Sequence, residues 1–144
     1  MALDMIKAEG LDAIWQRHET LARAVWAACE AWGQGGPLAM NVVGAAHRSR
    51  AVTSLSLGAP DGTRLRKWVE ANTGVTLGIG LGMDTPDDPQ SDGFFRIGHM
   101  GHVNAHMVLG VLGSIQAGLN ALDIPHGTGA LDAAATLISD ALTV

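Results

Sequence analysis

The feature that most constrains the fold is a long amphipathic segment near the N-terminus. Between positions 11 and 32, apolar residues recur at steps of three and four, the spacing of one face of an α-helix. Positions 33–37 then hold three glycines and a proline, which is typical of a helix end. The sequence therefore predicts a helix over 11–32 whose apolar face packs on other elements. This face comprises Leu11, Ile14, Trp15, His18, Leu21, Ala22, Val25, Trp26, Cys29 and Trp32.

Shorter segments fill the rest of the chain, and helical patterns alternate with short β-prone runs. Their order predicts an α+β domain spanning 1–144, with two layers and a small, mostly antiparallel sheet packed by helices. The predicted helices cover 2–9, 11–32, about 63–74, 104–122 and 128–142, with N-caps at 61–63, Asn104 and Thr128, and the predicted strands cover 37–44, 51–57, 75–82 and the residues around 94–97.

Composition and charge narrow the class of protein. The chain has 144 residues, of which 47% are hydrophobic, enough for one domain with a real core. A net charge of −5 argues against nucleic acid or a membrane surface as the main partner. A single cysteine, Cys29, favours a reducing compartment, and no signal peptide is recognisable, so we expect a cytoplasmic protein. The apolar run 105–122 contains polar residues, which favours a core helix over a membrane span.

The segment 75–82 (VTLGIGLG) alternates apolar residues with glycines. A strand with this pattern has one face without side chains, so another backbone or a ligand can approach it closely. The same glycines resemble part of a nucleotide-binding loop. That motif opens a helix, however, whereas an acidic, proline-rich loop over 83–93 follows here.

Three of the six histidines lie within eight residues, as His99, His102 and His106. Their spacing of three and four would place them on one face of a helix, so a metal site is one alternative. The neighbouring glycines oppose a continuous helix, and Asn104 is a typical N-cap, which would leave the first two histidines outside it. We therefore expect histidines that pack or form hydrogen bonds in a tight loop, and we assign no metal ligand.

Arg96 lies in an apolar and glycine-rich run, FFRIG, at positions 94–98. A guanidinium in such a setting needs an anionic partner, because burying it unpaired is costly. Its planar fork suits bidentate pairing with a carboxylate or a phosphate. Both a bound ligand and a structural Asp or Glu elsewhere in the chain remain open at this point.

Several segments resemble one family in the same order along the chain. They are EGLDAIWQRHETLARA (9–24), AHRSRAVTSLSLG (46–58), FFRIGHMGHVNAHMVLGVLGSIQAGLNAL (94–122) and HGTGALDAA (126–134). The chain resembles the C-terminal small domain of class V pyridoxal-phosphate-dependent aminotransferases, of the alanine–glyoxylate and serine–glyoxylate type. The Arg-Ile-Gly run at 96–98, with a further glycine three residues on and a long helix after it, is the most specific part.

The resemblance implies that Arg96 binds the α-carboxylate of the substrate and that Gly98 and Gly101 shape the loop beside it. It implies an enzyme that transfers an amino group from an amino acid of the alanine or serine type to a 2-oxo acid such as glyoxylate or pyruvate. Pyridoxal phosphate would be held by a lysine of a large domain that this chain lacks, since neither Lys7 nor Lys67 is a credible substitute. We therefore expect no catalytic or cofactor-binding residue here, a chain that is inactive alone, and a full-length homodimer.

An alternative from a different class is a stand-alone binding or interaction module. Such a module would pair with a separate large domain, or bind a metal through His99, His102 and His106. If the chain packs on a larger domain, part of its surface should be apolar.

Overall fold

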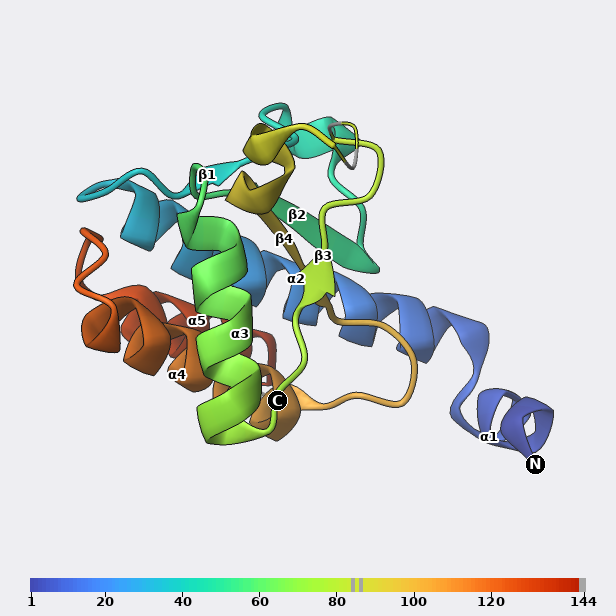
Figure 1. The fold of residues 1–144 in the computed structure, drawn as a ribbon. Coiled ribbons are helices and arrows are strands. Elements are labelled where there is room, and N and C mark those ends of the chain that lie inside the picture. The colour runs from blue at the N-terminus through green and yellow to red at the C-terminus, as the bar shows by residue number, and fades with distance from the viewer. Residues whose placement is uncertain (84, 86, 143–144) are drawn as a thin grey trace.

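The computed structural model of the chain describes residues 1–83, 85 and 87–142. Helices, strands and two short 3₁₀ turns (η1 and η2) follow one another as Figure 1 shows. The elements are α1 (Ala2–Glu9), α2 (Leu11–Gly33), β1 (Ala39–Met40), η1 (Ala45–His47), β2 (Val52–Ser56), α3 (Asp61–Thr73), β3 (Gly78–Ile79), η2 (Pro89–Gly93), β4 (Phe94–Gly98), α4 (Ala105–Ala121) and α5 (Ala130–Leu142).

The four strands form one antiparallel sheet in the order β1-β2-β4-β3. The register places Arg96 of β4 between Ser54 of β2 and Gly78 of β3. Side chains of β2 and β4 alternate between buried and partly exposed, as expected for a sheet with one face on the core. This architecture confirms the predicted α+β class with a small antiparallel sheet.

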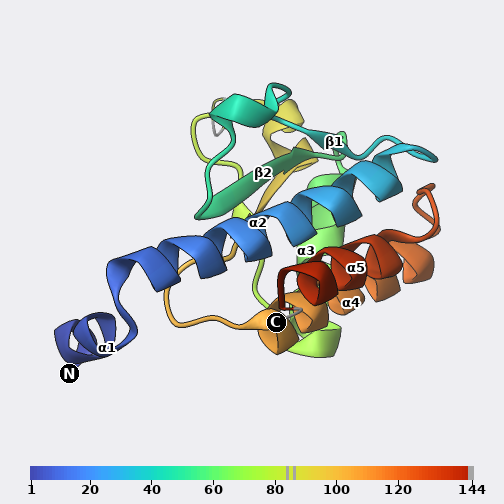
Figure 2. The same cartoon turned by 180° about the vertical axis from the view of Figure 1, so that it is seen from behind.

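The C-terminal half of α2 lies at the centre of the molecule. In Figure 2 it runs between the sheet and the α4–α5 pair, and it contacts both. Trp32 is completely buried, and its indole Nε1 donates to Gln116 Oε1 of α4 at 2.7 Å. The helix thereby joins the two layers, and its buried residues are Leu21, Ala22, Ala24, Val25, Trp26, Ala28, Cys29 and Trp32.

Helix α4 confirms the predicted core helix at 105–122. Leu112, Ile115 and Leu119 are buried completely within the core. Asn104 is its N-cap, as predicted, and the side-chain oxygen accepts from the backbone N–H of Met107 at 3.0 Å. Within the described part of the chain, no helix has the length and apolar character needed to cross a membrane.

Several predicted boundaries are wrong. The edge strands β1 and β3 have two residues each, because only these residues form ladder pairs with a neighbouring strand. Helix α3 begins at Asp61 itself, after Pro60, and no side chain caps it. Helix α5 begins at Ala130, so Thr128 is not its N-cap. The predicted loop 83–93 ends in η2, while its positions 84 and 86 lie outside the described residues.

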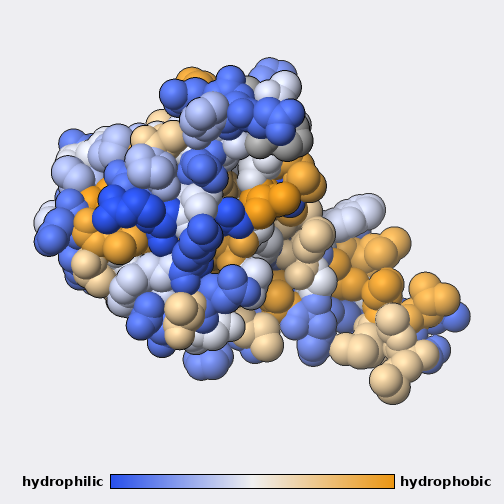
Figure 3. All heavy atoms as spheres, viewed as in Figure 1, coloured by the Kyte–Doolittle hydropathy of each residue, from blue (hydrophilic) through white to orange (hydrophobic). Residues whose placement is uncertain are grey.

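The N-terminal half of α2 departs from the predicted buried stripe. Leu11 is 56% exposed and Trp15 is 62% exposed, because α2 extends beyond the sheet and α5 here. Helix α1 lies at the same end of the molecule, and its Leu3 is 69% exposed. Apolar residues therefore gather on the surface around α1, as Figure 3 shows. This is the kind of surface expected of a chain that packs on a larger domain.

We predict that Gly118→Ala destabilises the contact between α3 and α4. A Cβ at this position would lie 2.7 Å from Leu65 Cδ1, closer than real Cβ contacts allow, and 3.1 Å from Val69 Cγ2, which is a tight contact. Overpacking of this kind costs about 1–3 kcal/mol. Urea unfolding measures the loss in the free energy of unfolding.

The matched control is Gly110→Ala in the same helix, where an added Cβ meets nothing within 4 Å. This substitution should stabilise the chain by up to about 1 kcal/mol through helix propensity alone. Equal effects of the two substitutions would show that α3 and α4 do not pack as described.

Candidate functional site

Arg96 lies in the middle of β4, on the sheet face opposite to the core. Its neighbours in the strand, Phe95 and Ile97, point into the core and are 0% and 2% exposed. Arg96 itself is only partly buried. The period of two along a strand produces this arrangement, so the apolar residues around Arg96 in the sequence do not enclose its guanidinium.

The guanidinium of Arg96 rests on the glycine face of β3. Its Nε donates to the carbonyl oxygen of Ile79 at 2.6 Å. A Cβ at Gly78 would lie only 3.2 Å from Arg96 Cβ and 3.4 Å from Nε. A Cβ at Gly80 would lie 2.5 Å from Phe94 Cβ. The close approach that the glycines of 75–82 predict is therefore confirmed, and β4 is the neighbour that uses it.

No carboxylate among the described residues forms an ion pair with Arg96. Within the same residues, its only hydrogen bond is the one from Nε, so no group there satisfies the Nη1 and Nη2 donors. The structural Asp or Glu that the sequence left open is thus not found in the described part of the chain. A planar guanidinium with free donors is suited to bidentate binding of an anion.

A pocket of about 260 Å³ opens beside Arg96. Ser54, Ser49 and His47 contribute polar side chains, and Met40 and Val42 contribute apolar surface. Apart from Arg96, these residues come from β1, β2 and the connection between them. The pocket thus combines a guanidinium whose outer nitrogens have no partner among the described residues, hydroxyl groups and apolar surface, as sites for small organic anions do.

The three clustered histidines do not come together. His99 is completely buried, whereas His102 and His106 are exposed. The described residues contain no group of three or more His, Cys, Asp or Glu side chains that could hold a metal ion. The metal-binding alternative for these three histidines therefore has no support, because β4 ends beside His99 and α4 begins only after His102.

His99 ends a chain of buried hydrogen bonds. Trp26 Nε1 donates to Thr53 Oγ1 at 3.0 Å, and Thr53 Oγ1 lies 2.8 Å from His99 Nε2. Because the Thr53 oxygen accepts from Trp26, its own proton is free to donate to the ring nitrogen of a neutral His99. Burial lowers the pKa of His99 below its usual 6.5, and the backbone carbonyl group of Arg50 acts in the opposite direction. His99 therefore has a structural role, and its burial favours the neutral form of the ring.

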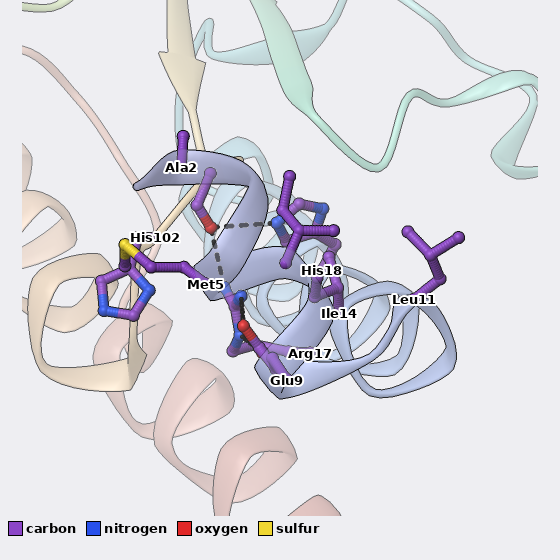
Figure 4. A pocket seen from close by; sticks show the side chains of 10 residues that line it. Ala2, Met5, Glu9, Leu11, Ile14, Arg17, His18 and His102 are labelled. Atoms are coloured by element: carbon purple, nitrogen blue, oxygen red, sulfur yellow. Dashed lines mark hydrogen bonds and ion pairs between the residues drawn. The ribbon is translucent and has the colours of Figure 1, made fainter.

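The loop after β4 is tied to the N-terminal helices by Arg17, which the sequence did not single out. Arg17 Nη1 donates to the carbonyl oxygens of Gly101 at 2.8 Å and Val103 at 2.9 Å. Its Nε and Nη2 donate to the two carboxylate oxygens of Glu9 at 2.7 and 2.8 Å. His18 Nε2 also lies 3.2 Å from the Gly101 oxygen. Figure 4 shows this cluster lining an apolar hollow between α1 and α2.

The two glycines of the predicted loop differ in conformation. Gly101 has φ +81°, a left-handed conformation that favours glycine, and this lets the chain turn between β4 and α4. Gly98 is instead the last residue of β4 and pairs with Val52. A Cβ at Gly98 would meet nothing within 4 Å.

Known proteins similar to this chain are about three times its length. No family model matches the chain. It is 34% identical to serine–glyoxylate aminotransferase of Arabidopsis thaliana over 94% of this chain and 31% of that enzyme. It is 32% identical to the soluble hydrogenase small subunit of a Synechococcus species, over 95% of this chain and 33% of that protein. The solved structure of ureidoglycine–glyoxylate aminotransferase from Bacillus subtilis matches 95% of this chain and 33% of that enzyme, with a TM-score of 0.79 and 26% identity.

These similarities define the class of protein. The chain is similar to glyoxylate aminotransferases in sequence and in fold, and it spans about one third of the length of the relatives it matches. The family that the Arg-Ile-Gly run indicates is thereby confirmed.

The residues present do not fit pyridoxal phosphate, the cofactor of this family. The cofactor is held by a lysine in a Schiff base, with further groups around its ring and phosphate. The two lysines of this chain, Lys7 and Lys67, are both exposed, on α1 and α3. The geometry of this chain therefore assigns no residue to the cofactor.

We predict that the buried His99 makes the stability of the chain fall at acidic pH. As the pH decreases below about 6.5, the unfolded chain takes up a proton at His99 before the folded chain does. From this group, the free energy of unfolding should therefore decrease as the pH falls below about 6.5, by at most about 1.4 kcal/mol for each pH unit. Urea unfolding at a series of pH values measures the slope.

The variant His99→Gln should lose this part of the slope, although it lowers stability at neutral pH. His102→Gln, at an exposed position of the same loop, is the control and should keep it. An unchanged slope in His99→Gln would mean that His99 can be protonated in the folded chain.

Proposed function

We propose that this chain is the substrate-binding C-terminal domain of a pyridoxal-phosphate-dependent aminotransferase, in which Arg96 binds the substrate α-carboxylate. The observation that carries the proposal is the guanidinium of Arg96. It is fixed by a single hydrogen bond, from Nε to the Ile79 carbonyl, and it has no carboxylate partner among the described residues. An arginine held in this way is prepared for an external anion.

The chemistry of the relatives agrees with a carboxylate ligand. Two of the similar enzymes are named for glyoxylate, the smallest 2-oxo acid, whose carboxylate is its one charged group. The pocket beside Arg96 has about 260 Å³, a size that suits a small acid. The reaction we propose is amino-group transfer from an amino acid of the alanine or serine type to a 2-oxo acid such as glyoxylate or pyruvate.

The cofactor chemistry of this reaction belongs to another part of the enzyme. Pyridoxal phosphate, when bound to a large domain, accepts the amino group from one substrate and passes it to the other. The present chain contributes the carboxylate anchor and the loops around it, so we expect it to be inactive alone. In the complete enzyme we further expect a homodimer in the cytoplasm.

A second candidate is a module that pairs with a separately encoded large domain. The exposed apolar residues of α1 and of the first turns of α2 are equally consistent with both candidates. A large domain would cover them whether it belongs to the same chain or to a separate one. The reading frame around this chain separates the two: an adjoining large domain supports a single enzyme, and its absence supports the pairing module.

We predict that Arg96→Ala, in the full-length enzyme containing this chain, raises the KM for the 2-oxo acid. Removing one partner of a hydrogen-bonded charge pair costs about 2–5 kcal/mol, which corresponds to roughly thirtyfold or more in KM. The absorption spectrum of the bound cofactor should be unchanged, since Arg96 acts on the substrate. Steady-state kinetics with glyoxylate or pyruvate measure the effect.

The control is Arg64→Ala, which removes an exposed arginine paired with Asp61 on α3 and should leave KM unchanged. Equal KM values for the parent enzyme and the Arg96→Ala variant would refute the assignment of Arg96.

We also predict that pyridoxal phosphate added to the isolated chain produces no absorption band of an internal aldimine. The reason is that Lys7 and Lys67 are both exposed, and neither lies in a pocket that could hold the cofactor. Spectrophotometric titration tests this, with free lysine at equal concentration as the control for unspecific Schiff-base formation. A band that exceeds the control and is lost in Lys67→Arg or Lys7→Arg would contradict it.

A further inference from the structure

We propose that Arg48 is a positioning residue for the carboxylate pocket of Arg96. It holds the connection between β1 and β2, residues 41–49, in place as one wall of that pocket. The inference rests on the proposed function of Arg96 and adds a residue whose role the sequence did not indicate.

Arg48 fixes the backbone of this connection through its side chain. Its Nε donates to the carbonyl oxygen of Val42 at 3.1 Å, and its Nη2 donates to that of Val43 at 3.2 Å. Its Nη1 forms an ion pair with Glu30 of α2 at 2.5 Å. The side chain of Arg48 is only 10% exposed, whereas its partner Glu30 is 54% exposed and remains in contact with water. One guanidinium thus ties the loop to the helix that carries the core.

The loop has few other anchors among the described residues. At its end, the Ser49 hydroxyl accepts from the backbone N–H groups of Ala51 and Val52. Asn41 N donates to the Ser54 carbonyl, which extends the pairing of β1 with β2 by one residue. The backbone N–H groups of His47 and Arg48 donate to the Gly44 and Ala45 carbonyls, but these bonds lie within the loop itself. Val43 is 82% exposed and adds no burial. The contacts of Arg48 are therefore what connects the middle of the loop to the rest of the domain.

The same side chain also reaches the floor of the pocket. The Arg48 guanidinium carbon lies 5.6 Å from the centre of a Trp26 ring, in a cation–π contact. Trp26 in turn donates to Thr53, which precedes Ser54, the cross-strand partner of Arg96. Trp26, Thr53 and Ser54 all line the pocket beside Arg96. Arg48 therefore sets the distance between the β1–β2 connection and the paired strands β2 and β4, the second of which carries Arg96.

The two arginines of this pocket have different roles because their bonding differs. All three nitrogens of Arg48 are engaged by the protein, and Glu30 offsets its charge. Arg96 uses Nε alone among the described residues. Only Arg96 is therefore available to a ligand, and Arg48 acts on the ligand through the loop that presents Val42, His47 and Ser49.

The test compares arginine variants in the full-length enzyme. Arg48→Ala should raise the KM for the 2-oxo acid about tenfold, because a displaced wall loosens the bound substrate, while kcat stays within about twofold. Arg48→Lys keeps a charge for Glu30 but cannot donate to both carbonyls, so its KM should also rise. The matched control is Arg50→Ala, two residues further on, which removes an exposed ion pair with Glu19 and should change neither constant.

A structural measurement on the present chain accompanies the kinetics. In Arg48→Lys, the backbone amides of residues 44–48 should exchange with deuterium faster than in the parent chain. The indole N–H signal of Trp26, assigned with Trp26→Phe, should also shift. If Arg48→Ala does not fold, Arg48→Lys and Glu30→Gln supply the kinetic comparison.

The outcomes separate this inference from the proposed function. If Arg96→Ala raises KM but the folded Arg48 variants do not, the positioning role is wrong and the role of Arg96 stands. If Arg96→Ala leaves KM unchanged, the proposed function is wrong, and the role of Arg48 is wrong with it.

Discussion

The buried half of α2 is the constraint on which the rest of the structure depends. Trp32 is completely enclosed, and its indole N–H donates to Gln116 of α4, so the helix cannot rotate without breaking this partly buried hydrogen bond. The same helix presents Trp26 to the sheet and Glu30 to Arg48. Helix α2 thus fixes the positions of the helical layer, the sheet and the loop beside Arg96.

Three arginines illustrate how bonding separates structural cations from a ligand receptor. Arg17 and Arg48 each combine one carboxylate with two backbone carbonyls, and they hold the loop after β4 and the connection between β1 and β2. Charged groups that are removed from water need such complete sets of partners. The outer nitrogens of Arg96, by contrast, are not used by the described residues. Arg17 and Arg48 therefore hold the surrounding loops in place, whereas Arg96 can bind a ligand. A preorganised anion site requires this arrangement.

The helices and the importance of Arg96 could be predicted from the sequence, whereas most of the contacts around them could not. The periodicity of α2 and α4 is long enough to define both helices, and the cap at Asn104 follows from a local hydrogen bond. The roles of Arg17 and Arg48 could not be predicted, because their partners include backbone carbonyls, and the Gly101 carbonyl is 84 residues away from Arg17. The exposure of Trp15 was also missed, since periodicity shows which residues share a face and not how far a covering layer extends.

We propose that this chain recognises the substrate and that the cofactor chemistry takes place outside it. The central proposal is that the Arg96 guanidinium, whose Nη1 and Nη2 have no partner among the described residues, receives the substrate carboxylate. The most direct measurement is a crystal structure of the full-length enzyme with a bound non-reactive carboxylate analogue of the substrate. We predict that the two carboxylate oxygens lie within hydrogen-bond distance of the Arg96 Nη1 and Nη2 atoms, in the pocket beside Ser54. A carboxylate bound by other residues, with Arg96 paired to a protein carboxylate, would contradict it.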